Sequence, residues 1–431
     1  MQFIHKVNIQ QKLHRLQSCK SLLNGALFSM YSFLNKGIIF LLLLLLANYI
    51  SPADYGYLSL FNTVLMVLGY FIALSADGYM GIVYFKEGED CQKQVISAIS
   101  FIILLISIVF LGILGISGKW VSQVVNLRVE MLYIGVVISA ATVFKNMYLD
   151  NIRLHEDVKL YGIVSCSNAF LFFVLSLVLV IGFHLSWYGQ IYANLLTTVL
   201  YGGYALYYFI RERYFTLHFK KILRPMILWS IPLIPHIASG FIRQGCDRYI
   251  INSYHSIDDV GLFSFALNIA NIVFIFGLGF NNSNSVDIYK TLGNKELSGV
   301  EKYNKLAKIR KLFSSLYLVI SIIVAILAYI FIPLLLPQYT ESKGYILFLA
   351  FFGYFQCVYL LWTNYLFYFN KTKQIMFITF GSSILHLLLS LWLTRYGLYY
   401  TAVIYCVTQG IVAFVIKYMA KKELNSNLLL N

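Results

Sequence analysis

Long apolar runs separated by short polar breaks occupy almost the whole chain, and they predict helices that cross a membrane. A spanning helix needs about 20 predominantly apolar residues. The runs of sufficient length are 21–50, 57–83, 95–116, 129–149, 161–183, 187–210, 226–251, 261–285, 311–333, 344–369, 374–394 and 397–417. The pattern therefore predicts an all-α polytopic membrane protein with about 12 transmembrane helices. The breaks leave no room for a separate catalytic domain, so we expect the function to lie inside the helix bundle.

Positive charge is distributed unevenly over the polar breaks, and this predicts the orientation of the chain. If the N-terminus is cytoplasmic and the spans alternate, 25 of the 33 Lys and Arg residues lie on the inner side and 4 in the outer loops. Such an excess of Lys and Arg is typical of cytoplasmic loops. We therefore expect a multi-pass protein with both termini in the cytoplasm.

The composition argues against several other classes of protein. Hydrophobic residues make up 59% of the 431 residues and charged residues 12%, against about 25% charged residues in soluble domains. The net charge of +15 would favour nucleic-acid binding in a soluble protein, but here the cytoplasmic loops explain it. The six cysteines are far apart and lack a His partner at ligand spacing, so we expect neither disulfides nor a metal site. No GxxxxGK[ST] loop is present, which argues against ATP hydrolysis by this chain.

An internal repeat divides the chain into two halves. The segment NYISPADYG at 48–56 aligns with SYHSIDDVG at 253–261, an offset of 205 residues, and each follows the first span of a six-span half. We therefore predict a parallel repeat of two pseudo-symmetric six-helix lobes. The N-lobe is 1–210, a basic cytoplasmic linker is 211–225, and the C-lobe with a cytoplasmic tail is 226–431. The alternative is a short turn chosen twice, with Ser as cap and Gly to end it.

Four basic side chains fall within predicted spans, where an ionised group is costly and needs an explanation. They are Lys36, Lys145, Arg243 and Arg248. In one interpretation they line a cleft and bind phosphate, Arg as a bidentate fork and Lys as a point charge. In the other they are structural. Arg243 then pairs with Asp247 one helical turn away, Arg248 reaches the outer interface, and Lys145 anchors a span end.

Two acidic side chains within spans are candidates for coupling transport to an ion, H⁺ or Na⁺. Asp77 lies near the inner end of the second span and Asp247 lies in the seventh. His236 and His386 also lie within spans, where a histidine either relays protons or hydrogen-bonds a neighbouring helix. No other cofactor is expected.

The eighth predicted span is rich in asparagine. Asn268, Asn271 and Asn282 are spaced to share roughly one face of a helix. These amides, Asn271 among them, are candidates for contacts with sugar hydroxyls, or alternatively for bridges between helices.

The segments LANYISPADYGYLSLFNTV at 46–64 and LSADGYMGIVYFKE at 74–87 resemble the N-terminal signature of the Wzx-type polysaccharide flippases. These transporters belong to the multidrug/oligosaccharidyl-lipid/polysaccharide (MOP) superfamily. The family pattern, roughly Ala-Arg-x-Leu-x-Pro-x-x-Tyr/Phe-Gly, is met by Ala47, Pro52, Tyr55 and Gly56. The position after the Ala is Asn48 here, which puts a role for the usual basic charge in doubt.

The resemblance implies a V-shaped, MATE-like bundle in the bacterial inner membrane. Its substrate would be an undecaprenyl-pyrophosphate-linked oligosaccharide, such as an O-antigen unit of lipopolysaccharide, moved to the periplasmic leaflet by alternating access. Partners would include a polysaccharide polymerase or other assembly proteins.

Two other functions remain open at this point. One is a MATE-type multidrug or cation antiporter, which should carry acidic groups in its cleft. The other is a polysaccharide polymerase or glycosyltransferase, which should have a sizeable outer loop with catalytic Arg or Asp.

Overall fold

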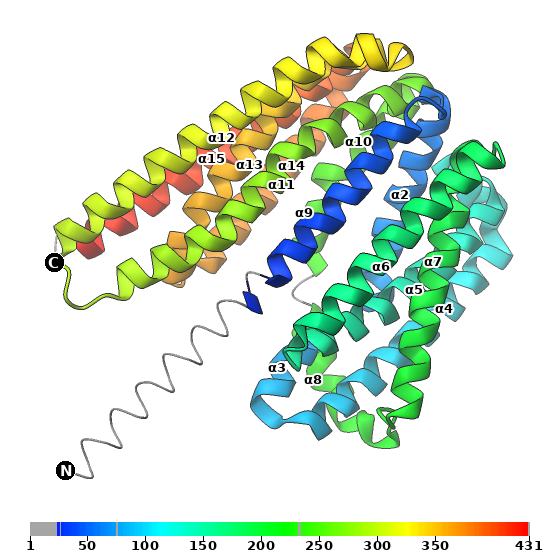
Figure 1. Ribbon diagram of the computed structural model, residues 1–431, viewed down its shortest axis with the longest axis horizontal. Helices are drawn as coiled ribbons and strands as arrows, with labels where there is room; N and C mark the ends of the chain where they lie inside the picture. The colour runs from blue at the N-terminus through cyan, green and yellow to red at the C-terminus, as the bar shows by residue number, and fades with distance from the viewer. Residues whose placement is uncertain (1–23, 26, 75, 232–233, 430–431) are drawn as a thin grey trace.

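In the part of the chain that the structure describes, residues 24–25, 27–74, 76–231 and 234–429 of this computed structural model, the protein is built from helices with no strand (Figure 1). A first helix spans Leu27–Leu46. The others are α2 (Pro52–Ala73), α3 (Asp77–Glu87), α4 (Glu89–Val125), α5 (Val129–Leu154), α6 (Val158–Leu177), η1 (Val178–Gly182), α7 (Ser186–Arg211), η2 (Leu217–Phe219), α8 (Lys220–Ser230), α9 (Ile234–Gln244), α10 (Cys246–Tyr254), α11 (Ile257–Gly293), α12 (Gly299–Leu335), η4 (Pro337–Ser342), α13 (Lys343–Tyr368), α14 (Thr372–Leu393), η5 (Thr394–Tyr396) and α15 (Leu398–Leu428).

The predicted class of fold is confirmed, and the number of continuous spans differs from the prediction. Over the described residues, 10 helices are long and apolar enough to cross a membrane. The sixth predicted run is α7, a helix of 26 residues that is not among these 10. The seventh, 226–251, is divided among α8, α9 and α10. None of these three helices is by itself long enough to count among the 10.

The interruption between α9 and α10 lies at Gly245. A glycine in a helix interior costs about 1 kcal/mol relative to alanine. The ring of Phe241 occupies the space beside it, because a Cβ at Gly245 would lie 2.6 Å from that ring. Helix α10 starts at Cys246, and the Gly245 N–H still donates to the Phe241 carbonyl at 2.7 Å.

Serine caps set the starts of the two helices that follow the repeated segments. The Ser51 hydroxyl accepts a hydrogen bond from the Asp54 N–H at 3.2 Å at the start of α2. The Ser256 hydroxyl and Asp259 form a reciprocal capping box at the start of α11. Such caps satisfy backbone donors that have no partner within the helix. The serine caps that would be expected if the repeated segments were only similar turns are therefore present.

The helices form two bundles that converge at one end and diverge at the other (Figure 1). In one bundle α5 packs against α2, α4 and α7, and in the other α13 packs against α11, α12 and α15. The principal contact between the bundles is between α2 and α11. The bundles are apart at the end that carries the C-terminus, α3 and α8.

The contact between α2 and α11 brings together residues that are 205 positions apart. The Ser59 hydroxyl donates to the Ser264 hydroxyl at 2.7 Å. A Cβ at Gly56 would overlap the Ile257 carbonyl, and a Cβ at Gly261 would overlap the Pro52 carbonyl. These glycines do not end a turn, as the alternative interpretation required, but permit two helices to cross closely. Two pairs of residues related by the 205-residue offset, Ser59 with Ser264 and Gly56 with Gly261, are therefore in direct contact.

The apolar core is continuous only at the convergent end. One cluster of buried side chains extends from the N-lobe across the start of α11 to Tyr345 and Tyr405 of the C-lobe. A separate cluster fills the other half of the C-lobe, around Tyr317 and Trp362. The linker region is partly helical, because α8 starts at Lys220 and packs against α3 and α4, whereas α9 packs against α14.

Candidate functional site

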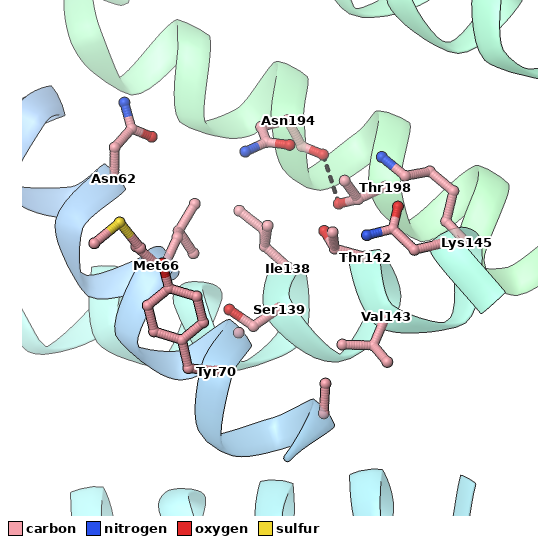
Figure 2. A pocket seen from close by; sticks show the side chains of 14 residues that line it. Asn62, Met66, Tyr70, Ile138, Ser139, Thr142, Val143, Lys145, Asn194 and Thr198 are labelled. Atoms are coloured by element: carbon pink, nitrogen blue, oxygen red, sulfur yellow. Dashed lines mark hydrogen bonds between the residues drawn. The ribbon is translucent and has the colours of Figure 1, made fainter. Parts of the chain in front are cut away.

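Among the described residues, three cavities with polar side chains in their walls lie inside the N-lobe or between the lobes. The largest, about 590 Å³, is inside the N-lobe and is lined by α2, α5 and α7. In Figure 2, Asn194 and Thr198 of α7 lie beside Thr142 and Lys145 of α5, and Met66 and Tyr70 of α2 form another side. Several hydroxyls and amides therefore surround one lysine. We refer to this space as the N-lobe cavity.

Lys145 is positioned within the N-lobe cavity by a neighbouring helix. Its Nζ donates to the Asn168 Oδ1 of α6 at 3.3 Å. The Thr198 hydroxyl, which lines the same cavity, donates to the backbone carbonyl of Asn194 at 2.6 Å (Figure 2). Among the described residues no carboxylate forms an ion pair with Lys145. Its charge is therefore available to an anion in the cavity.

Two further cavities lie between the lobes, with volumes of about 440 and 170 Å³. Lys36 of the first helix lines the larger and Arg248 of α10 lines the smaller. Asn268 and Asn271 of α11 line both. Asn62 of α2 lines all three cavities, so they adjoin one another around this residue. We refer to the three together as the central cavities.

Arg248 connects the C-lobe with the α2 crossing. Its Nε donates to the Ser59 hydroxyl, and its Nη1 donates to the carbonyl of Gln244. On the same side, the amide of Asn268 donates to the Tyr55 hydroxyl at 2.6 Å. Arg248 thus lies at the inter-lobe contact.

The central cavities are positive and rich in amides. Their described lining residues include three cations, Lys36, Lys145 and Arg248, and no Asp or Glu. The amides among them are Asn62, Asn146, Gln190, Asn194, Gln244, Asn268, Asn271 and Gln356. A cation attracts phosphate oxygens, and amides both donate to and accept from hydroxyl groups. The arrangement suits an anionic ligand with many hydroxyls.

Arg243 does not join this set. It is not among the lining residues of the three cavities, and its Nη1 donates to Gln409 Oε1 of α15 at 3.3 Å. The predicted pair of Arg243 with Asp247 is also not formed. Arg243 and Asp247 are instead each hydrogen-bonded to a different helix of the C-lobe, Arg243 to Gln409 of α15 and Asp247 to His386 of α14.

Asp247 pairs instead with a histidine from another helix. Its Oδ2 lies 2.7 Å from His386 Nε2 of α14, and both side chains are almost fully buried. Asp77 begins α3, but its side chain lies outside the described part of the chain, as do those of His236 and Asn282.

Most of the amides in the central cavities were not predicted. Only Asn268 and Asn271 were recognised, because they lie together in a run of asparagines. Asn62 and Asn194 are single amides within long apolar runs, and that isolation was the signal that could have identified them.

A fourth cavity, of about 410 Å³, is apolar. Its lining residues are aliphatic or aromatic, from α2, α4, α5, α9 and α10. Tyr249 of α10 lines this apolar cavity, whereas the preceding residue, Arg248, lines the smaller inter-lobe cavity. Polar and apolar spaces therefore lie on different sides of the same short helix.

The chain matches two family models. A model described as polysaccharide biosynthesis protein matches residues 21–282, more than half of the chain. A model described as MatE matches residues 232–392. Two proteins of Haemophilus influenzae are similar in sequence. Lsg locus putative protein 1 is 24% identical over 354 residues, which is 79% of this chain and 83% of that protein. An uncharacterized membrane protein is 24% identical over 359 residues, 82% and 85% of the two chains.

Solved structures of MATE transporters share the fold. The inward-facing conformation of a multidrug resistance MATE family transporter of the MOP superfamily aligns with a TM-score of 0.69 and 14% identity, covering 93% of this chain and 95% of that one. The outward-facing conformation of such a transporter aligns with a TM-score of 0.61 and 15% identity, covering 94% and 95%. The first family model covers more than half of the chain, and the solved structures share its helical architecture, so the chain belongs to the polysaccharide biosynthesis protein family and is a polytopic membrane protein with a MATE-like fold.

Proposed function

We propose that this transporter is a flippase for an undecaprenyl-diphosphate-linked oligosaccharide, which it moves from the cytoplasmic to the outer leaflet of the bacterial inner membrane. The observation that carries the proposal is the chemistry of the central cavities, which combine three cations with eight amides and include no Asp or Glu among their described lining residues. A diphosphate needs cations, and a glycan needs groups that donate and accept hydrogen bonds.

The cations have distinct positions along the proposed binding site. Lys36 and Arg248 lie between the lobes, where a lipid headgroup enters from the side, and Lys145 lies inside the N-lobe. Asn271 and the other amides of the cavities hold the sugars. The apolar cavity next to α10 supports a ligand with a hydrocarbon chain, because it places an apolar space beside Arg248.

Alternating access is the mechanism that this shape supports. The lobes meet at the α2–α11 crossing and diverge at the end that carries the C-terminus. By the predicted orientation, that end is cytoplasmic. The higher TM-score with an inward-facing transporter than with an outward-facing one agrees with a state that receives its substrate from the cytoplasm. The reaction is transport without covalent chemistry.

The proposal is tested by transport in proteoliposomes. A fluorescent undecaprenyl-diphosphate-linked disaccharide is placed in both leaflets, and a membrane-impermeant quencher reports how much of it crosses. We expect the Lys145→Met variant to move this lipid about 10- to 100-fold more slowly than the wild type, because a charge-assisted contact contributes about 1.5–3 kcal/mol. We expect the Lys36→Met variant to be slowed in the same direction.

Lys343→Met is the matched control. Lys343 begins α13, its Nζ lies 5.2 Å from the ring centre of Tyr329, and it lines none of the central cavities. Its replacement should leave transport unchanged. Normal transport by both cavity variants would overturn the cation site. Transport of a cationic dye in place of the lipid would favour the multidrug antiporter instead.

A further inference from the structure

The connection between α12 and α13 of the C-lobe fastens the convergent end to the N-lobe. In this connection, η4, the Tyr339 hydroxyl donates to the Ile50 carbonyl at 2.8 Å. The Gln338 amide donates to the carbonyls of Ala47 and Ile50. Ala47 and Ile50 directly follow the first helix, and carbonyls at a helix end lack partners within the helix. The C-lobe therefore supplies these partners. We refer to Gln338 and Tyr339 as the latch.

Tyr339 of the latch is held between aromatic rings of both lobes. Its side chain is 0% exposed. Phe265 of α11 stacks on it with 4.2 Å between ring centres, and Tyr55 of α2 packs edge-on with 6.1 Å between ring centres. Tyr55 also packs edge-on against Phe265, at 6.0 Å. Aromatic pairs in these geometries are favourable beyond the area that they bury. The position of Tyr55 therefore affects the packing of Tyr339.

Tyr55 connects these rings with the larger inter-lobe cavity. It lines that cavity together with Asn268 of α11. Its hydroxyl accepts a hydrogen bond from the Asn268 amide at 2.6 Å. A ligand in the cavity thus meets both partners of a hydrogen bond that is connected, through the ring of Tyr55, to the latch.

We propose that Asn268, Tyr55 and Tyr339 form a relay through which a sugar hydroxyl bound at Asn268 opens the convergent end. The inference rests on the proposed function, because the ligand at Asn268 is the glycan of the transported lipid. It adds the residues that sense the sugar and the latch that they release.

The direction of the effect follows from the hydrogen bonds that each state can make. The bonds from Asn268 to Tyr55 and from Tyr339 to Ile50 both join the C-lobe to the N-lobe, so opening the convergent end breaks them. A sugar hydroxyl that takes the Asn268 amide displaces Tyr55 in the closed state. The open state has already lost that bond and pays nothing for the exchange. The sugar therefore binds the open state more tightly and shifts the population toward it.

The repeat places a second, weaker contact at the equivalent position of the other lobe. Asn252 of α10 corresponds to Ala47 at the offset of 205 residues. It accepts a hydrogen bond from the amide of Asn126, at the end of α4, at 3.3 Å in an exposed position. The latch differs because its Tyr339 is buried and is connected, through Tyr55, to a cavity. The latch is therefore the contact through which a ligand acts.

Pulsed electron spin resonance on the full-length protein in nanodiscs tests the latch without a ligand. The spin labels are attached at Glu130→Cys of the N-lobe and Tyr396→Cys of the C-lobe, two exposed positions, in a background that lacks the native cysteines. Their separation reports whether the convergent end is open or closed. We expect Tyr339→Phe to raise the ratio of open to closed molecules by about three- to fivefold, the effect of losing one hydrogen bond.

Two control variants should leave this ratio almost unchanged. Tyr317→Phe is the matched control, because Tyr317 is 1% exposed and its hydroxyl has no hydrogen-bond partner. Asn126→Ala removes the exposed contact at the same end and should change the ratio by less than about twofold. A shift in Asn126→Ala as large as that in Tyr339→Phe would overturn the special role of the latch.

The relay is tested by removing either partner of its first hydrogen bond. Asn268→Leu removes the amide at similar volume and imitates its capture by a sugar, and Tyr55→Phe removes the acceptor. Each should raise the ratio of open to closed molecules by about three- to fivefold. The double variant should shift it no further than either single variant, because both changes remove the same bond. Tyr55→Phe keeps its ring, so it decides the question if Asn268→Leu fails to fold.

Two lipid probes separate this inference from the proposed function. Farnesyl diphosphate linked to N-acetylglucosamine should raise the ratio by about threefold or more in the wild type and not in Asn268→Leu. Farnesyl diphosphate without the sugar should leave it unchanged. If neither probe binds but the Tyr339, Tyr55 and Asn268 variants open the convergent end, the relay is supported and the flippase proposal fails. Unchanged ratios in these variants, or equal shifts with the two probes, overturn the relay and leave the flippase proposal intact.

Discussion

The two lobes share a helix plan but use their interiors differently. Helices α5 and α13 have 26 residues each, and Lys145 and Tyr359 occupy the same position counted from the first residue of their helices. In the N-lobe this position borders a cavity of about 590 Å³. In the C-lobe Tyr359 is an aromatic residue packed against an apolar core. The lysine of one lobe is thus a tyrosine in the other.

The two cations of the C-lobe interior have partners within the lobe, although one buried nitrogen of each, Arg243 Nε and Arg310 Nη1, has no hydrogen-bond partner. The Arg310 guanidinium lies over the rings of Tyr303, Trp362 and Tyr365, at 5.1 to 5.5 Å from their centres. Arg243 is hydrogen-bonded to Gln409. A cation that already has partners contributes to packing, whereas a cation facing a cavity can bind a ligand. The comparison teaches that charge within a span indicates function only once its neighbours are known.

Replacing Gly261 should lower the stability more than any other change considered, because it forces apart α2 and α11, the helices through which the two lobes meet. A side chain at Gly261 would overlap the backbone carbonyl of Pro52, which cannot move without moving α2. We expect Gly261→Val to destabilise the protein by about 3 kcal/mol or more, as strong overpacking does. Thermal unfolding in detergent measures the change.

Gly112→Ala is the control for that substitution. Gly112 lies in the interior of α4, and a Cβ there has no atom within 4 Å. Alanine is the better helix former by about 1 kcal/mol. The control should therefore be neutral or more stable. Equal unfolding temperatures for Gly261→Val and the wild type would show that the close crossing is not required.

Replacing Arg310 sharpens the contrast between the lobes. Arg310→Lys keeps the charge but loses the planar group that stacks on three rings, and we expect a loss of about 1 kcal/mol in stability. Transport per folded molecule should not change. The mirror experiment is Lys145→Met, which should lower transport and leave the unfolding temperature within error. A large transport defect in Arg310→Lys would show that the C-lobe interior also takes part in binding.

The hydrogen bond between Ser59 and Ser264 should have the smallest effect. A double-mutant cycle with Ser59→Ala and Ser264→Ala measures their coupling, and we expect about 0.6 kcal/mol, the average for such bonds in a membrane protein. Because Ser59 also accepts from Arg248, the single Ser59→Ala change should cost more than Ser264→Ala. Equal losses of stability in Ser59→Ala and Ser264→Ala would show that the contact of Ser59 with Arg248 adds no stability.

Much of the fold was predictable because it depends on local properties. A run of about 20 apolar residues must form a helix in lipid, where no water satisfies the backbone. The repeat at an offset of 205 residues was readable because Ser and Asp at a helix start are local cap chemistry. The boundary between α9 and α10 at Gly245 was not predicted, because the ring of Phe241 beside Gly245 is a contact that the spacing of apolar residues does not reveal.

The candidate site was predictable in part. Charge within a span drew attention to Lys36, Lys145 and Arg248, and all three line the central cavities. The same criterion selected Arg243, which lies against Gln409 instead. Asp247 was considered as a partner of Arg243 in one interpretation, and it pairs with His386 instead. Its histidine is 139 residues away in the sequence, and no periodicity within one helix could have indicated it.

By itself the sequence determined that this chain spans a membrane many times, that its two halves are related, and that it carries positive charge within its spans. These properties depend on composition and on residues close in the chain. The tertiary structure alone decided which charges face a shared cavity and which contact partners inside a lobe. The reason is that the phase and packing of helices set the direction of a side chain, and these depend on contacts between residues far apart in the sequence.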